Sequence, residues 1–133
     1  MKILIHFILT LVVYSLLDLA FINLFAKEFI QKQVGEMLAP TADLKAAVVF
    51  YLIFIITLLY FCVYPAYETR SVMKSIISGA LFGLVTYGTY ELVNKSLLAN
   101  WPIQMVIVDM IWGVFVGTTV SWASYQIMGL LKM

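Results

Sequence analysis

The stretch Ala46–Tyr64, AAVVFYLIFIITLLYFCVY, contains no charged residue and is bounded by Pro65. At about 1.5 Å of rise per residue, roughly 20 apolar residues are enough to cross the hydrocarbon layer of a bilayer. No water is present there to satisfy backbone N–H and C=O groups, so a single spanning segment must be helical. The stretch therefore predicts a transmembrane helix that ends near the proline.

The rest of the chain has the same character. Of its 133 residues, 64% are hydrophobic and only 11% are charged, and the mean hydropathy is +1.03. A soluble domain carries about 25% charged residues, so this chain lacks the polar surface that a water-exposed protein needs. Three further apolar segments lie at about 3–26, 72–93 and 102–131. Together with 46–64 they predict an all-α, single-domain membrane protein over residues 1–133, an antiparallel bundle of four transmembrane helices.

The segment Lys27–Pro40, KEFIQKQVGEMLAP, is too polar to span. Its apolar residues recur at helical spacing between charged and amide side chains, which is typical of a short helix lying in the headgroup layer. We expect such an interfacial helix between the first and second spans. An ordinary solvated loop is the alternative. The apolar residues are Phe29, Ile30, Val34, Met37 and Leu38.

The charges and the rarer residue types exclude several classes of function. Eight Lys and Arg balance seven Asp and Glu, so we expect no nucleic-acid partner. One cysteine, Cys62, and one histidine, His6, cannot form a disulfide or a metal site between them, and we expect no cofactor. The expected partner is the lipid bilayer. Four helices enclose little interior, which favours some self-association without giving a subunit number.

Two pairs of glycines predict how the helices meet. Gly79 and Gly83 lie four residues apart in the third span, and Gly113 and Gly117 do so in the fourth. Small residues at this spacing let helix backbones approach closely, which matters because lipid provides no hydrophobic drive for helix association. Both pairs fall near the middle of their spans. They should face each other in an antiparallel hairpin, leaving the second span, which has no such row, toward lipid.

Three acids stand out against this apolar background. Asp18 lies about eight residues before the end of the first span, and Asp109 about seven residues into the fourth, so both lie roughly 10–12 Å below the same membrane face. Glu91 is shallower, about one turn from that face. A carboxylate in hydrocarbon costs about 2.5–3.5 kcal/mol even on the lenient insertion scale. We therefore expect the three acids to share a polar pocket, where carboxyl groups so close would not all ionise.

Polar and aromatic residues accompany the acids at helical spacing and are candidates for the same pocket. A functional pocket would bind a ligand or protons, but other interpretations stay open. Asp18 and Asp109 could form a purely structural network, and Glu91 could simply reach the headgroups. Trp101, like other aromatic residues near the span ends, is expected at the interface, and so is His6. The accompanying candidates are Tyr14, Tyr87, Tyr90, Asn94 and Trp112.

The run GALFGLVTYGTYELVN…NWPIQMVIVDMIWG resembles a bacterial family of predicted membrane proteins of unknown function. The family pattern has an acid late in the first span, a YP pair after the second, GALFGL followed by YGTYDLTN, a WP pair and VDxxWG. The chain departs from this pattern at Glu91, which replaces Asp, and at Val93, which replaces Thr. The resemblance implies a four-helix protein of the bacterial inner membrane and no particular activity. The matching residues are Asp18, Tyr64-Pro65, Gly79–Leu84, Tyr87–Tyr90, Trp101-Pro102, Val108-Asp109 and Trp112-Gly113.

Three functions fit these features. The first is a transport or binding module whose acidic and aromatic pocket holds a small polar or cationic ligand, a lipid or protons. The second is a membrane-embedded enzyme, or enzyme subunit, acting on lipid acyl chains, with Glu91 and Asp109 as an acid–base pair. The third is a subunit that binds a partner protein. Because no Ser–His or Cys–His set is apparent, no catalytic residue can be assigned and an enzyme is the less favoured alternative.

Overall fold

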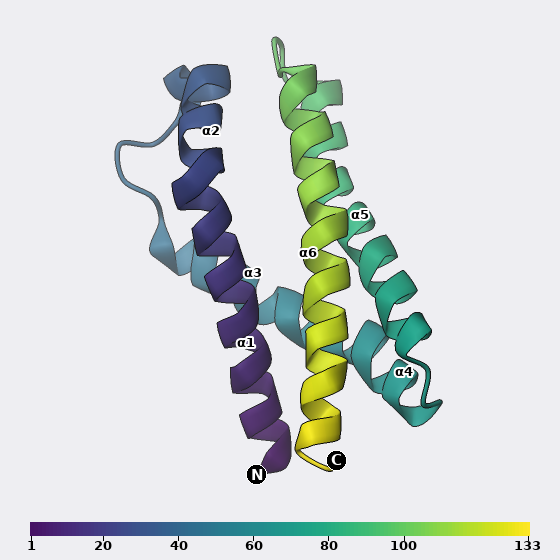
Figure 1. The fold of residues 1–133 in the computed structure, drawn as a ribbon. Coiled ribbons are helices and arrows are strands. Elements are labelled where there is room, and N and C mark those ends of the chain that lie inside the picture. The colour runs from purple at the N-terminus through teal and green to yellow at the C-terminus, as the bar shows by residue number, and fades with distance from the viewer.

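The computed structural model describes all residues from 1 to 133 and consists of helices and their connections, with no strand. Four helical segments are long and apolar enough to cross a membrane, as predicted: Lys2–Met37, Leu44–Glu68, Val72–Leu97 and Ile103–Leu130. Both termini lie at the same end of the molecule (Figure 1). The elements are α1 (Lys2–Phe21), η1 (Ile22–Ala26), α2 (Lys27–Val34), η2 (Gly35–Met37), α3 (Leu44–Leu58), η3 (Leu59–Val63), α4 (Tyr64–Glu68), α5 (Val72–Leu97) and α6 (Ile103–Leu130).

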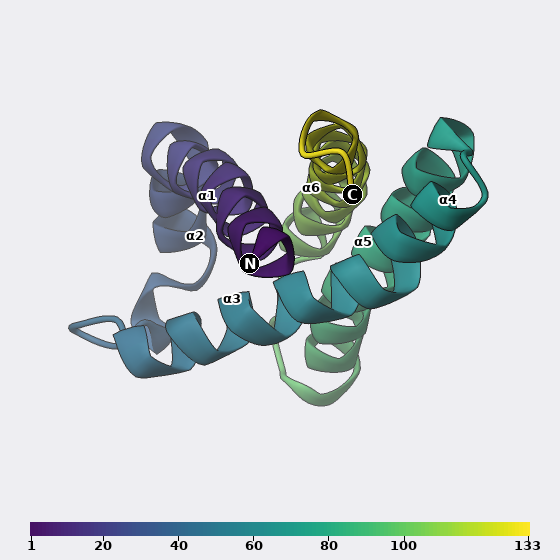
Figure 2. The same ribbon diagram turned by 90° about the horizontal axis from the view of Figure 1, so that it is seen from below.

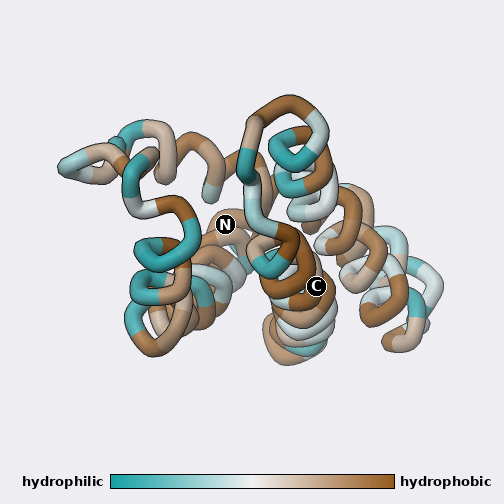
Figure 3. Tube along the Cα trace, turned by 90° about the horizontal axis from the view of Figure 1, so that it is seen from above, coloured by the Kyte–Doolittle hydropathy of each residue, from teal (hydrophilic) through white to brown (hydrophobic).

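The first helix is longer than the sequence suggests. α1 passes through one π-helical turn, η1, directly into α2, and both junction residues, Ile22 and Lys27, keep right-handed helical angles. No glycine or proline interrupts the chain before Gly35, so nothing forces a break at the end of the apolar run. The segment 27–34 is thus helical, but a separate interfacial helix is not clearly shown. Hydrophilic residues gather in α2 and at the turns, whereas apolar residues dominate the spans (Figure 3).

The second helical segment crosses the others obliquely and supplies much of the core (Figure 2). Phe54, Ile55 and Leu58 from α3, with Cys62 and Val63 from η3, are almost completely buried. The expectation that this segment faces lipid is therefore wrong for one of its sides. A uniformly apolar helix carries no sequence signal for the side that packs inward, because lipid and protein interior are equally apolar.

The helix ends are set by local capping. Asp43, whose side chain accepts hydrogen bonds from the backbone N–H groups of Lys45 (3.1 Å) and Ala46 (3.3 Å), starts α3 two residues before the predicted beginning. Pro65 does not end this segment, because it occupies the first turn of α4, where its missing N–H is tolerated. Pro102 immediately precedes α6, as its position at a helix start predicts.

α5 and α6 pack against each other through backbone at the four glycines. A Cβ added at Gly83 would collide with the carbonyl oxygen of Gly113, and one added at Gly79 would collide with that of Gly117. One turn farther along α5 toward its N-terminus, Ser121 Oγ donates to the carbonyl oxygen of Ser75 at 2.7 Å. The two helices are thus antiparallel: a residue four positions later in α5 faces a residue four positions earlier in α6.

This contact gives a first prediction. Gly83→Ala should lower the free energy of unfolding by about 1–3 kcal/mol, because the added methyl group has no space against the backbone of α6. The measurement is an SDS titration of the purified protein in mixed micelles with an uncharged detergent. Gly129→Ala is the matched control, since nothing lies within 4 Å of a Cβ built there. Equal losses for the two variants would contradict the close helix contact.

Candidate functional site

Two carboxyl groups meet where α5 ends and α6 begins. Glu91 is only 1% exposed, and its Oε1 accepts a hydrogen bond of 2.9 Å from the indole Nε1–H of Trp101. The carboxyl group of Asp109 on α6 is a close neighbour of that of Glu91, and both line the same pocket. Trp101 is itself 6% exposed, so it is a buried partner of the acid and not the interfacial residue that was expected. Glu91 is thus enclosed by protein side chains.

A second set of hydrogen bonds surrounds Asp18 on α1. The hydroxyl of Tyr51, from α3, donates to Asp18 Oδ2. The hydroxyl groups of Tyr14 and Tyr87 are hydrogen-bonded at 2.8 Å, and the ring of Tyr14 packs edge-on against Tyr51 with centroids 5.0 Å apart. Residues from α1, α3 and α5 thus join in one tyrosine cluster around this acid.

Trp112 lies beside this tyrosine cluster. Its indole stacks on the ring of Phe21, with centroids 4.1 Å apart and planes inclined by 4°. The indole Nε1 is buried and has no hydrogen-bond partner. Trp112 therefore holds α6 against α1 through its ring, and the side chains of Asp18 and Tyr87 are the polar neighbours of its indole N–H.

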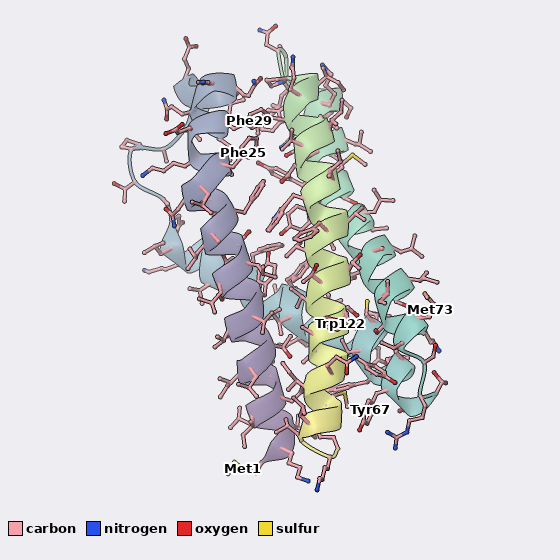
Figure 4. All side chains as sticks on the ribbon, in the orientation of Figure 1. Met1, Phe25, Phe29, Tyr67, Met73 and Trp122 are labelled. Carbon is pink, nitrogen blue, oxygen red and sulfur yellow. The ribbon has the colours of Figure 1, made fainter.

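A pocket of about 470 Å³ opens beside the carboxyl pair, between the first helical segment and the α5–α6 hairpin. Phe25 and Phe29 project from the first segment toward α6 (Figure 4), and Phe29 lines the pocket. One wall comes from the first segment and its connection: Phe21, Ala26, Phe29, Ile30, Val34, Met37 and Leu38. The other comes from α5, α6 and the turn between them: Tyr90, Glu91, Asn94, Leu98, Trp101, Met105, Val108 and Asp109.

A smaller cavity of about 310 Å³ shares Asp109 with the larger pocket. Phe50 of α3 and Thr86 and Tyr87 of α5 line it, together with Tyr90 and Asp109. Those last two residues also line the larger pocket, so they stand between the two cavities. Asp109 thus belongs to the lining of both.

The eight candidate residues from the sequence fall into two groups. Glu91, Asp109, Tyr90 and Asn94 line the larger pocket, whereas Asp18 does not and instead pairs with Tyr51. Tyr14 and Tyr87 join the tyrosine cluster, and Trp112 packs next to it. Sequence reasoning missed Tyr51. The one available signal was a hydroxyl in a charge-free span, and nothing in the sequence shows which way it points.

A separate polar cluster lies at the other end of the bundle, where the termini are. His6 is fully buried, and its Nε2 lies 3.0 Å from the carbonyl oxygen and 2.8 Å from the Oγ of Ser124. Thr10 Oγ1 lies 2.8 Å from the same Oγ. His6 thus points into the bundle, where α6 offers it hydrogen-bond partners, and its expected position at the membrane interface stays a prediction. No group of three or more His, Cys, Asp or Glu side chains is placed to hold a metal ion.

Comparison with known families agrees with this architecture. The model of the family described as Predicted membrane protein (DUF2177) matches residues 3–126. The chain belongs to this family. The matched region includes the second and third spans, nearly all of the first and most of the fourth, and both carboxyl groups of the pocket. No match was found among curated proteins or among solved structures.

The Glu91–Trp101 contact gives a second prediction. Trp101→Phe should lower the free energy of unfolding in the SDS titration by about 1–3 kcal/mol, because it leaves a buried carboxyl group without its donor. Combining it with Glu91→Met should recover part of the loss, since no polar group is then left unsatisfied. Trp122→Phe is the control, because Trp122 is 44% exposed (Figure 4). A Trp101→Phe variant as stable as this control would show that the hydrogen bond contributes nothing.

Proposed function

We propose that this protein binds a small polar or cationic ligand, or protons, at the Glu91–Asp109 pocket, and passes it within the membrane. The observation that carries the proposal is the presence of two carboxyl groups, from neighbouring helices, in the wall of one pocket of about 470 Å³. A pocket of this volume is typical of small-molecule sites. The resemblance to bacterial membrane proteins and the four spans support a multi-pass location in the bacterial inner membrane.

Electrostatics favours a cation or proton at this pair. An ionisable group inside a membrane is costly and usually marks a ligand or proton site. The carboxyl group of Glu91 accepts one hydrogen bond, from the neutral indole of Trp101. Its ionisable neighbour is the acid Asp109, so neither carboxyl group has a positive counter-charge. The structure contains no salt bridge to either acid. A bound cation, or a proton shared by the pair, would supply the missing charge.

The two cavities support movement past Asp109. Tyr90 and Asp109 line both, so a ligand held by Asp109 in the larger pocket could be handed to the smaller one. Asp18, held by Tyr51, would serve this pathway as a further acid at some distance from the pocket. Tyr14 and Tyr87 would link it to Asp109 by hydroxyl groups.

A second candidate is an enzyme, or enzyme subunit, acting on lipid acyl chains. Of the 15 residues that line the larger pocket, 12 are hydrophobic, which suits an acyl chain. Glu91 and Asp109 would then act as an acid–base pair. A lipid profile of a deletion strain that is identical to wild type would count against this function.

Binding of benzyltrimethylammonium tests the principal proposal. The probe is a small cation with one apolar group, and isothermal titration of the full chain in an uncharged detergent measures its affinity. We expect saturable binding by the wild type and a loss of at least tenfold in affinity for Asp109→Asn and for Glu91→Gln, because each removes a carboxylate facing the cation.

Glu28→Gln is the matched control, since Glu28 is exposed on α2 and does not line the pocket. This variant should bind as the wild type does. Binding that survives in both pocket variants, or that is equally weakened by Glu28→Gln, would refute the proposal. Size-exclusion profiles identical to wild type establish that the pocket variants are folded.

A further inference from the structure

The larger pocket has two chemically different walls. The first helical segment contributes only apolar side chains, including Phe29, Ile30 and Val34. The opposite wall contributes all the polar groups, which belong to Tyr90, Glu91, Asn94, Trp101 and Asp109. A ligand that fills this space must therefore present a polar group to one wall and apolar surface to the other. A fully hydrated ion would leave the apolar wall without a contact.

The charge of the lining selects the sign of the polar end. No Lys, Arg or His lines the pocket. Two acids, Glu91 and Asp109, line it, and both lie on the same wall. The nearest base in sequence, Lys95, is exposed, and its Nζ donates to the carbonyl oxygen of Trp101 at 2.9 Å. A fatty-acid carboxylate or a phosphate headgroup would be repelled by the two acids and would find no basic side chain to bind it. A cationic head suits the site.

Two aromatic rings stand beside the acids. Tyr90 and Trp101 meet edge-on, with ring centroids 6.2 Å apart, and both line the pocket. Aromatic faces attract alkylammonium groups, most strongly where water is excluded. The rings and the carboxyl pair thus offer one ammonium group both kinds of partner that it needs.

From these features we propose that the ligand of the pocket is a single-chain cationic amphiphile, whose ammonium head lies at Glu91 and Asp109 and whose tail lies along the wall formed by Phe29, Val34 and Met37. The inference rests on the proposed function and specifies the class of its ligand. The pocket volume of about 470 Å³ is in the range that accepts one drug-sized molecule. The tail supplies apolar area, and the head supplies the charge that the acids lack.

A series of probes with matched heads tests the inference. Affinities of the full chain for tetramethylammonium, benzyltrimethylammonium and dodecyltrimethylammonium are measured in the same uncharged detergent, with dodecyl sulfate as the anion of equal tail length. We expect dodecyltrimethylammonium to bind at least tenfold more tightly than benzyltrimethylammonium, and dodecyl sulfate not to compete. Asp109→Asn should abolish this preference for the cation.

Met37→Ser tests the tail wall separately. Met37 lines the pocket at its half-exposed rim, and the change should weaken dodecyltrimethylammonium binding at least threefold without affecting benzyltrimethylammonium. Leu24→Ser is the control, because Leu24 is 86% exposed and lies outside the pocket. This variant should bind both cations as the wild type does.

The outcomes separate the inference from the function on which it rests. If benzyltrimethylammonium binds as tightly as the dodecyl compound, and both need Asp109, the tail has no site and the inference fails while the proposed function stands. If dodecyl sulfate binds as tightly as the dodecyl cation, binding is nonspecific partition and the inference fails. If no cation binds, both fail.

Discussion

The close contact of α5 with α6 is the constraint on which the site depends. Backbone meets backbone at Gly79, Gly83, Gly113 and Gly117, so any larger residue at these positions would collide with the facing helix. The register of the two helices is thereby fixed over the whole hairpin. Continued by one turn beyond Gly83 and Gly113, that register places Tyr87 opposite Asp109, and both line the smaller cavity. Glu91 follows one turn later, which makes it a close neighbour of Asp109.

The first helix adds a polar stripe to this hairpin. His6, Thr10 and Tyr14 are fully buried and recur every four residues, so they lie on one face of α1, with Asp18 one turn farther on. Each finds its partners on another helix: Ser124 on α6, Tyr87 on α5 and Tyr51 on α3. In an apolar solvent such hydrogen bonds distinguish one rotation of a helix from the others, because apolar contacts alone do not. The stripe therefore orients a helix whose apolar faces are otherwise equivalent.

The sequence predicts the number and approximate limits of the spans, because their length and hydropathy are set by the bilayer. It also predicts which glycines meet, because only residues without side chains permit that approach. It does not predict the inward face of α3, where Phe54 and Ile55 look no different from lipid-facing neighbours. Nor does it reveal Tyr51 as the partner of Asp18, or Trp101 as the partner of Glu91. Those pairs depend on side-chain directions across helices that are distant in sequence.

The continuity of the first helix matters for the site. A helix lying flat in the headgroup layer would have carried Phe29, Ile30 and Val34 away from α6. Because α1 continues through η1 into α2, these side chains instead face the hairpin and form the apolar wall of the larger pocket. Without that wall, Glu91 and Asp109 would be two polar side chains near a helix end and would not line a pocket. The extended helix opposite them completes a pocket with carboxyl groups on one side and hydrocarbon side chains on the other.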